Sequence, residues 1–133
     1  LSVPQIAETY SYRAAQQMLA DGVVVIFAGG TGNPYFTTDT GATLRALEAE
    51  CDALFKATQV DGVYDSDPKK NLEAKRYTEV SYDDVIAKEL KVMDMTAISM
   101  ARENKLPIIV FKQENENSLT NALSGKGNYT IIK

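Results

Sequence analysis

An apolar run followed directly by a glycine-rich loop is the feature that most constrains the fold of this chain. Residues 23–27 are the most strand-like run in the sequence, and Gly29, Gly30 and Gly32 come soon after them. A helical pattern begins near Thr40, so the loop is expected at the carboxyl end of a buried strand. Open α/β sheets bind ligands at such ends, and glycines let the backbone come close to a ligand. The stretch therefore predicts a site for a phosphorylated small molecule.

Helical and strand-like patterns alternate along the rest of the chain. Helices are expected at Tyr12–Ala20, 40–50, 81–90, 95–104 and Ser118–Leu123, and strands at 23–27, 53–58, 77–80, 108–111 and Tyr129–Ile132. Strands separated by helices imply a largely parallel sheet with helices on both faces. The length of 133 residues and the 44% apolar content suit one core, so residues 1–133 are predicted to form a single α/β domain.

The expected helix over residues 40–50 has an amphipathic pattern. Its apolar residues recur at helical spacing, which predicts that they face the core; they are Ala42, Leu44, Leu47 and Cys51. Cys51 is the single cysteine of the chain, so an internal disulfide is excluded and a reducing compartment is favoured.

Composition excludes several kinds of function. The chain has no histidine, which removes the usual general base and the commonest metal ligand, so zinc chemistry and serine-histidine triads are excluded. The formal net charge of -4 argues against nucleic acid as the main partner. The longest apolar run, residues 23–28, is too short to span a bilayer. A cytoplasmic protein with no membrane partner is predicted.

Familiar nucleotide and metal motifs fail when they are tested against this sequence. Tyr35 stands where a dinucleotide fingerprint needs its third glycine, and no Gly-Lys-Ser/Thr of a P-loop is present. Asp61, Asp65 and Asp67 lack the glycine and the distal glutamate of a calcium-binding loop. No metal-binding residue is therefore predicted. The loops at 29–39 and 61–68 each follow an expected strand, so we expect them to form one site at the same edge of the sheet.

Three motifs carry a resemblance to a known enzyme family. They are Gly29-Gly30-Thr31-Gly32-Asn33-Pro34-Tyr35-Phe36-Thr37-Thr38-Asp39, Lys56-Ala57-Thr58-x-Val60-Asp61-Gly62-Val63-Tyr64-x-x-Asp67-Pro68 and Lys88-Glu89-Leu90-Lys91-Val92-Met93-Asp94. The chain resembles bacterial uridylate kinases of the amino-acid kinase superfamily over its whole length. The resemblance implies a partial carbamate kinase-like fold, a three-layer αβα arrangement with a mainly parallel sheet. Such kinases open with a lysine-containing Ser-Gly-Glu loop that this sequence lacks, so the chain is expected to be the C-terminal, nucleotide-binding half.

The resemblance also implies roles for individual residues. The acceptor UMP would be held by Thr31, Gly32, Asn33, Pro34, Tyr35, Phe36, Thr37 and Thr38. ATP would be held by Thr58, Tyr64 and Asp67, with the Tyr64 ring beside the adenine. Asp39 matches the superfamily aspartate that orients catalytic lysines. Asp94 lies near the position of a lysine in acetylglutamate kinases and is the second catalytic candidate.

The implied reaction suits a chain without histidine. In transfer of phosphate from ATP to UMP, giving ADP and UDP for pyrimidine nucleotide biosynthesis, the nucleophile is a phosphate oxygen that is already ionised near neutral pH. Cations and Mg²⁺ that arrives with ATP carry the chemistry instead of a general base. Four cations, Arg45, Lys56, Lys69 and Lys70, form no phosphate cradle by themselves, so this polypeptide alone is expected to be inactive. The resemblance implies a homohexamer.

Structural readings compete with several of these assignments. Residues 29–32 could form a simple strand-to-helix turn, and Thr38, Asp39 or Thr40 must cap a helix in any case. Asp94 is as well explained by an N-cap. Two other functions also stay open: a non-catalytic nucleotide-binding or storage protein on the same scaffold, similar to molybdenum storage proteins, and a kinase that forms acyl phosphates. Asp39 and the acceptor loop favour phosphoryl transfer to UMP.

Overall fold

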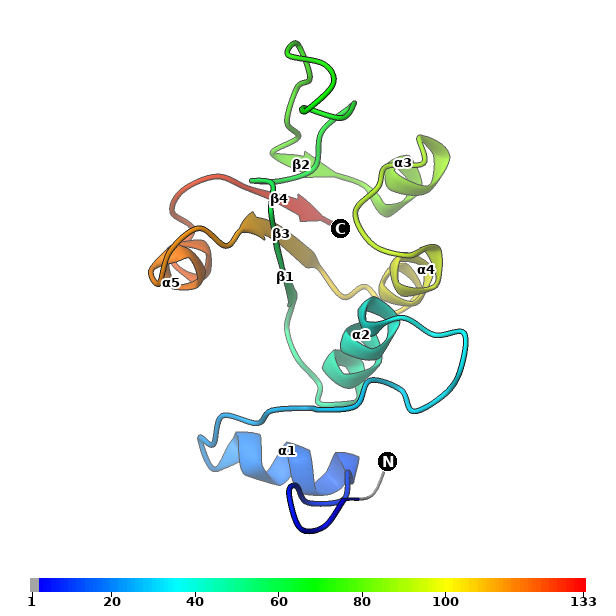
Figure 1. Ribbon diagram of the computed structural model, residues 1–133, viewed down its shortest axis with the longest axis vertical. Coiled ribbons are helices and arrows are strands. Elements are labelled where there is room, and N and C mark those ends of the chain that lie inside the picture. The colour runs from blue at the N-terminus through cyan, green and yellow to red at the C-terminus, as the bar shows by residue number, and fades with distance from the viewer. Residues whose placement is uncertain (1–2) are drawn as a thin grey trace.

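Residues 3–133, the part of the chain that the computed structural model describes, form helices and strands around one sheet (Figure 1). The elements are α1 (Tyr12–Ala20), α2 (Thr38–Glu48), β1 (Leu54–Thr58), β2 (Glu79–Val80), α3 (Tyr82–Ala87), α4 (Met95–Glu103), β3 (Ile108–Lys112), α5 (Ser118–Leu123) and β4 (Tyr129–Ile132). The predicted order is therefore confirmed with the exception of one expected strand. Within these described residues no helix is long and apolar enough to cross a membrane.

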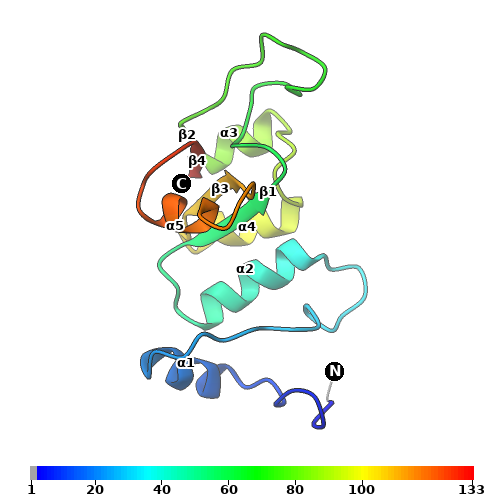
Figure 2. The same ribbon diagram turned by 60° about the vertical axis from the view of Figure 1, so that its left-hand side comes forward.

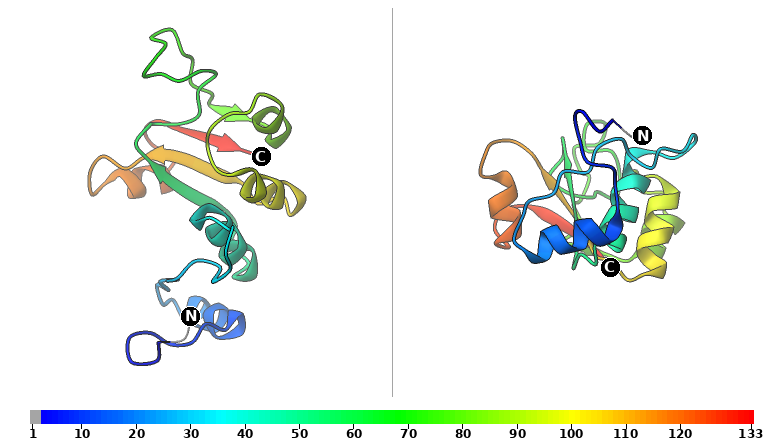
Figure 3. Two further views of the ribbon diagram at one scale, coloured as in Figure 1. Left: turned by 45° about the vertical axis from the view of Figure 1, so that its right-hand side comes forward. Right: turned by 90° about the horizontal axis from the view of Figure 1, so that it is seen from below.

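The four strands form one mixed sheet in the order β1-β3-β4-β2. β1 runs parallel to β3 and β2 runs parallel to β4, whereas β3 and β4 are antiparallel. Helices α2, α3 and α4 lie on one side of the sheet and α5 lies on the other, as Figures 1 and 3 show. The three-layer α/β class with a mostly parallel sheet is confirmed.

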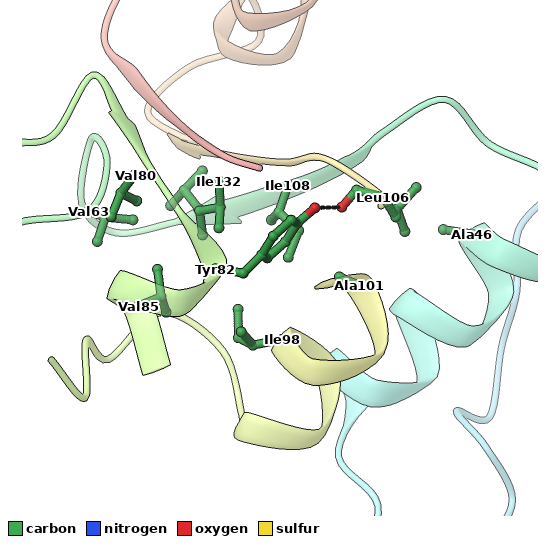
Figure 4. Packing of buried hydrophobic residues seen from close by; sticks show 11 residues of the cluster. Ala46, Val63, Val80, Tyr82, Val85, Ile98, Ala101, Leu106, Ile108 and Ile132 are labelled. Carbon is green, nitrogen blue, oxygen red and sulfur yellow. Dashed lines mark hydrogen bonds between the residues drawn. The ribbon is translucent and has the colours of Figure 1, made fainter. Parts of the chain in front are cut away.

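The core lies between the sheet and helices α3 and α4 (Figure 4). Ile108 and Ile132 are neighbours across the β3–β4 pair, and both are fully buried against Ile98 of α4. Burial of one such side chain contributes about 1.5 to 3 kcal/mol. Tyr82 reaches into the same cluster, and its hydroxyl donates a hydrogen bond to the carbonyl of Leu106. This cluster anchors β3, whose carboxyl end borders the candidate site.

Residues 23–27 form no strand, which corrects the prediction of a buried strand before the glycine loop. Val24 and Ile26 are 90% and 89% exposed. A strand is stabilised by backbone pairing with a neighbour, and within residues 3–133 no strand pairs with this segment. The segment instead runs between α1 and α2 (Figure 2), where Phe27 packs edge-on against Tyr10 at a centroid distance of 5.8 Å. High β-propensity alone does not make a strand.

Helix α2 differs from its prediction in its start and in its buried face. It begins at Thr38 and not at residue 40. The buried side contains small residues, namely Thr40, Gly41, Thr43 and Ala46. Ala42 is exposed, and so is Cys51, which corrects the prediction that both face the core. The reason is packing: α2 contacts α4 and β1, its fully buried residues are small, and Leu47 packs against the core from a partly buried position.

Candidate functional site

The glycine-rich loop between residues 29 and 36 is shaped by left-handed backbone angles. Gly29 and Gly32 have φ values of 89° and 73°, which residues with a side chain rarely adopt. Thr31 stabilises the turn, because its Oγ1 accepts a hydrogen bond from the N–H of Asn33 at 3.1 Å. Tyr35 also has a positive φ, of 69°, and its side chain is fully exposed. The loop therefore presents backbone amides and small polar groups, which suits binding of an anion.

Two residues of α2 contact this loop and hold it in position. Gly41 lies so close to it that a Cβ at this position would stand 3.4 Å from the Cα of Gly30. Arg45 donates a hydrogen bond to the Gly30 carbonyl at 3.4 Å. The guanidinium of Arg45 is held in turn by an ion pair with Glu48 and by the ring of Tyr10, whose centroid is 4.0 Å away. The loop thus contacts α2 through Gly41 near its start and through Arg45 in its last turn.

The N-cap of α2 is Thr37, which corrects the prediction that Thr38, Asp39 or Thr40 serves as the cap. Its side chain accepts hydrogen bonds from the N–H groups of Asp39 at 3.1 Å and of Thr40 at 3.3 Å. The carboxylate of Asp39 is therefore not needed for capping. Asp39 instead lies in the first turn of α2, where the glycine loop ends and where the helix dipole interacts favourably with a carboxylate.

Asp39 forms an ion pair with Lys56 of β1. The two side chains are only 21% and 28% exposed, so the pair is partly sheltered from solvent. Lys56 precedes Thr58, the last residue of β1, by two positions. The pair therefore links the loop of the expected acceptor to the strand that leads to the expected ATP site. Lys56 was not among the predicted catalytic residues, although a lysine inside an apolar strand was the signal that could have identified it.

Asp94 is the N-cap of α4, which confirms the structural reading. Its Oδ1 accepts a hydrogen bond from the N–H of Ala97 at 3.1 Å. The carboxylate also accepts hydrogen bonds from the hydroxyls of Thr37 and Thr40, which belong to the start of α2. Partial burial raises the pKa of Asp94, but the hydrogen bonds from Thr37, Ala97 and Thr40 more than offset this, so its pKa lies below the usual value. Asp94 thus joins two helix N-termini, and its catalytic role stays a prediction.

A cavity of about 500 Å³ lies at the carboxyl ends of β1 and β3. Tyr64 lines this cavity, as predicted for an ATP-binding residue. Three lining residues that the sequence reasoning missed are Lys112, Lys126 and Asn128. Lys112 is the last residue of β3, whereas Lys126 and Asn128 lie in the polar turn before β4, and this turn was the only signal in the sequence.

Thr58 and Asp67 do not line this cavity, although both were predicted to bind ATP. Thr58 closes a turn, since its Oγ1 accepts a hydrogen bond from the N–H of Val60 at 2.9 Å. Asp67 closes another, accepting from the N–H of Lys69 at 2.9 Å. Both shape the segment that bears Tyr64, and direct contact with ATP stays a prediction for them.

The two loops that were expected to form one site do not touch through polar groups. In the described part of the chain, no hydrogen bond or ion pair joins residues 29–38 to residues 59–68. The first loop projects beside α2 (Figure 1), whereas residues of the second line the cavity at the carboxyl ends of β1 and β3. The Asp39–Lys56 pair is the polar contact that lies between them. The site therefore consists of an acceptor side and a cavity side that meet at β1.

The architecture, the glycine loop that leads into α2 and the cavity at the strand ends define an α/β fold with a ligand site at the ends of its strands. Residues 4–112 match the sequence profile described as the Amino acid kinase family. The chain belongs to this family.

Comparison with individual proteins narrows the likeness further. The uridylate kinase of Hyphomonas neptunium is 54% identical over 132 residues, which is 99% of this chain and 53% of that protein. The uridylate kinase of Roseobacter denitrificans is 54% identical over 133 residues, or 100% of this chain and 55% of that protein. The chain spans about half the length of the curated relatives it matches.

Solved structures show the same likeness. The crystal structure of UMP kinase from Ureaplasma parvum has a TM-score of 0.95 at 36% identity and covers all of this chain and 57% of that one. UMP kinase from Bacillus anthracis has a TM-score of 0.94 at 38% identity, with 100% and 55% covered. Both matches cover the whole of this chain, and they therefore include the exposed extended segment at residues 23–27.

Proposed function

We propose that the full-length protein that contains this chain transfers a phosphoryl group from ATP to UMP and produces ADP and UDP. The similarity to uridylate kinases supports the choice of UMP as acceptor. The observation that carries the proposal is the Asp39–Lys56 ion pair. It puts a cation between the glycine loop, where we place UMP, and the cavity beside Tyr64, where we place ATP.

The chemistry of the reaction matches the side chains present. The attacking oxygen of UMP needs no general base, since the second pKa of a phosphate is about 6. The transferring group requires positive charge and precise placement. Asp39 orients the ammonium group of Lys56, and the amides of residues 29–32 are available to the acceptor phosphate. A carboxylate that only capped a helix would not need a lysine partner.

Magnesium enters this account with ATP, as part of the substrate. Among residues 3–133, no group of three carboxylates, cysteines or histidines lies close enough together to hold a metal ion. When bound with ATP, the ion would neutralise negative charge on the phosphates. We assign the phosphate-bound ion no ligand from this chain.

The resemblance to uridylate kinases also supports a proposal for the oligomeric state and the cellular location of the protein. We include a cytoplasmic homohexamer in the proposal, and light scattering of the full-length protein measures its mass directly. The 133-residue chain by itself is expected to have negligible kinase activity, because its sequence lacks the lysine-containing Ser-Gly-Glu loop of the kinases that it resembles.

A coupled assay of ADP release tests the function. The full-length protein should release ADP from ATP only when UMP is added, and the 133-residue chain should not. Binding of ATP without UMP-dependent release would instead establish the non-catalytic nucleotide-binding protein. Brisk turnover by the 133-residue chain would contradict the expectation that further residues supply the cations.

A further inference from the structure

The carboxylate of Asp61 accepts hydrogen bonds from two residues that line the cavity. The hydroxyl of Tyr64 donates to Oδ1 at 2.6 Å, and Nδ2 of Asn128 donates to Oδ2 at 2.9 Å. Both carboxylate oxygens are therefore engaged by partners from different segments. Tyr64 belongs to the segment after β1, whereas Asn128 directly precedes β4. Asp61 joins these two segments across the cavity lining.

Arg76 completes this network from a third segment, just before β2. Its Nε lies 3.9 Å from Oδ2 of Asp61, and its guanidinium donates to the Asn128 side chain at 3.3 Å. It also donates to the carbonyl of Tyr129 at 2.6 Å. The positive charge of Arg76 thus compensates the negative charge of the partly buried Asp61 on the side of the network that faces β4.

The backbone beneath the network has almost no freedom to move. Gly62 has a φ of 147°, and a Cβ there would stand 2.5 Å from Oγ1 of Thr130. The N–H of Val63 donates to that same hydroxyl oxygen at 2.9 Å. Asp61 and Tyr64 therefore stand on either side of a segment that is fixed to β4. The position of the Tyr64 ring then depends on its own side chain and on what holds its hydroxyl.

The shifts in pKa indicate which group donates in the hydrogen bond between Tyr64 and Asp61. Partial burial raises the pKa of Asp61, but the hydrogen bonds from Tyr64 and Asn128 lower it more, so its pKa is below the usual value. The hydrogen bond to Asp61, together with partial burial, raises the pKa of Tyr64. At neutral pH Tyr64 is therefore the donor and Asp61 the ionised acceptor.

We propose that Asp61 is a positioning residue for the donor nucleotide, holding the Tyr64 ring and the Asn128 side chain in the places where the cavity admits an adenine nucleotide. This inference rests on the proposed function. Asp61 also lines the cavity, but both of its carboxylate oxygens are engaged by Tyr64 and Asn128, so it acts through these partners. Fixing the ring in advance removes an ordering cost from ATP binding.

The test uses three variants of the full-length protein in steady-state kinetics. Tyr64→Phe keeps the ring and removes only the hydroxyl, so it should raise KM for ATP about threefold. Asp61→Ala removes both acceptor oxygens and should raise it about tenfold, in line with loss of hydrogen bonds to a charged group. Asp61→Asn keeps one acceptor for Tyr64 and should fall between them. In all three, KM for UMP should change less than twofold.

A double variant separates positioning from general damage. Because both single changes remove the same bond, Asp61→Ala combined with Tyr64→Phe should behave like Asp61→Ala alone. Asp83→Asn is a matched control: Asp83 of α3 is 82% exposed, and its Oδ1 lies 3.0 Å from Nη1 of Arg102 of α4 in an ion pair. It removes a carboxylate from an aspartate–arginine pair outside the cavity and should leave both KM values unchanged. Additive effects in the double variant, or equal rises in both KM values, would overturn the inference.

A direct measurement of ATP binding tests the positioning role of Asp61 independently of the proposed kinase function. Calorimetry with ATP and Mg²⁺ on the same proteins should show Kd rising in the same order as KM. If the wild-type protein binds ATP but does not phosphorylate UMP, the proposed function fails, and the order of Kd values still supports the positioning role. Unchanged Kd in Asp61→Ala and Tyr64→Phe, or no ATP binding by the wild-type protein, would refute it.

Discussion

The hydroxyl of Thr37, the N-cap of α2, donates a hydrogen bond to the carboxylate of Asp94, the N-cap of α4. One carboxylate therefore satisfies donors at the starts of two helices that pack against each other. Thr37 also ends the glycine loop, so the position of that loop depends on the helix pair. Replacement of Asp94 should therefore lower the stability of the fold and displace the acceptor loop.

Asp94→Ala in the full-length protein should lower the free energy of unfolding by about 2 kcal/mol at pH 7, the upper range for loss of an N-cap. The pKa of Asp94 is lowered in the folded state, so its contribution is complete above the unfolded pKa of about 3.9 and is lost as the pH falls through the folded value. The gap between wild type and variant should therefore be constant above about pH 5 and shrink below pH 4.

Thermal unfolding of both proteins between pH 3 and pH 8 measures this gap. Asp94→Asn, which still caps a helix well, should recover much of the stability at pH 7. A gap that stays the same down to pH 3 would show that the charge of Asp94 does not contribute.

The contact between Gly41 and Gly30 yields a second prediction. A Cβ at position 41 would be at van der Waals distance from the loop, so Gly41→Ala should keep KM for UMP near the wild-type value and stabilise α2 by up to about 1 kcal/mol. Gly41→Val adds two methyl groups that must push the loop away. It should raise KM for UMP several-fold with KM for ATP unchanged. A wild-type KM for UMP in Gly41→Val would mean that α2 does not position the loop.

The elements that depend on local signals were predictable from the sequence. Helix α1 has the predicted bounds, since a helical pattern ended by Gly22 needs no distant partner. Strand β4 also has its predicted bounds, and there the β-rich run meets paired neighbours in β3 and β2. The face of α2 was not predictable, because which side is buried depends on how closely α4 and the loop approach. The expected strand at residues 23–27 failed for the same reason, since only a paired neighbour makes a strand.

The candidate site also contains residues that were predictable from the sequence and contacts that were not. The motif around Gly29 and the aromatic Tyr64 are visible in the sequence, and the structure puts Tyr64 on the cavity. The Thr37–Asp94 bond joins residues 57 positions apart, and the Asp39–Lys56 pair joins residues 17 apart. No spacing rule reveals such pairs. They follow from the path of β1 and α4 past the start of α2.

The two substrate sides should respond to different substitutions. Tyr64→Ala removes an aromatic face from the cavity and should raise KM for ATP by an amount equivalent to about 1 to 3 kcal/mol, the usual contribution of base stacking. KM for UMP should be nearly unchanged. Steady-state kinetics in which each substrate is varied separately measures both. The assignment of the cavity to ATP fails if Tyr64→Ala mainly weakens UMP.

Thr31→Val is the complementary change on the acceptor side. It removes at nearly constant volume the hydroxyl whose oxygen accepts from the N–H of Asn33. We expect KM for UMP to rise and KM for ATP to stay constant in the same kinetic assay. If Thr31→Val and Tyr64→Ala disturb both substrates alike, the two sides are not separate.

The kcat of Asp39→Asn in the full-length protein tests the central claim most directly. Thr37 caps α2, so this change leaves the cap intact and removes only the charge that pairs with Lys56. The account predicts that kcat for UMP-dependent ADP release falls at least a hundredfold, as it does when a single electrostatic group of an active site is lost, while the melting temperature changes by no more than about 2 °C. A kcat close to wild type would contradict it and would leave the Asp39–Lys56 pair as a structural contact only.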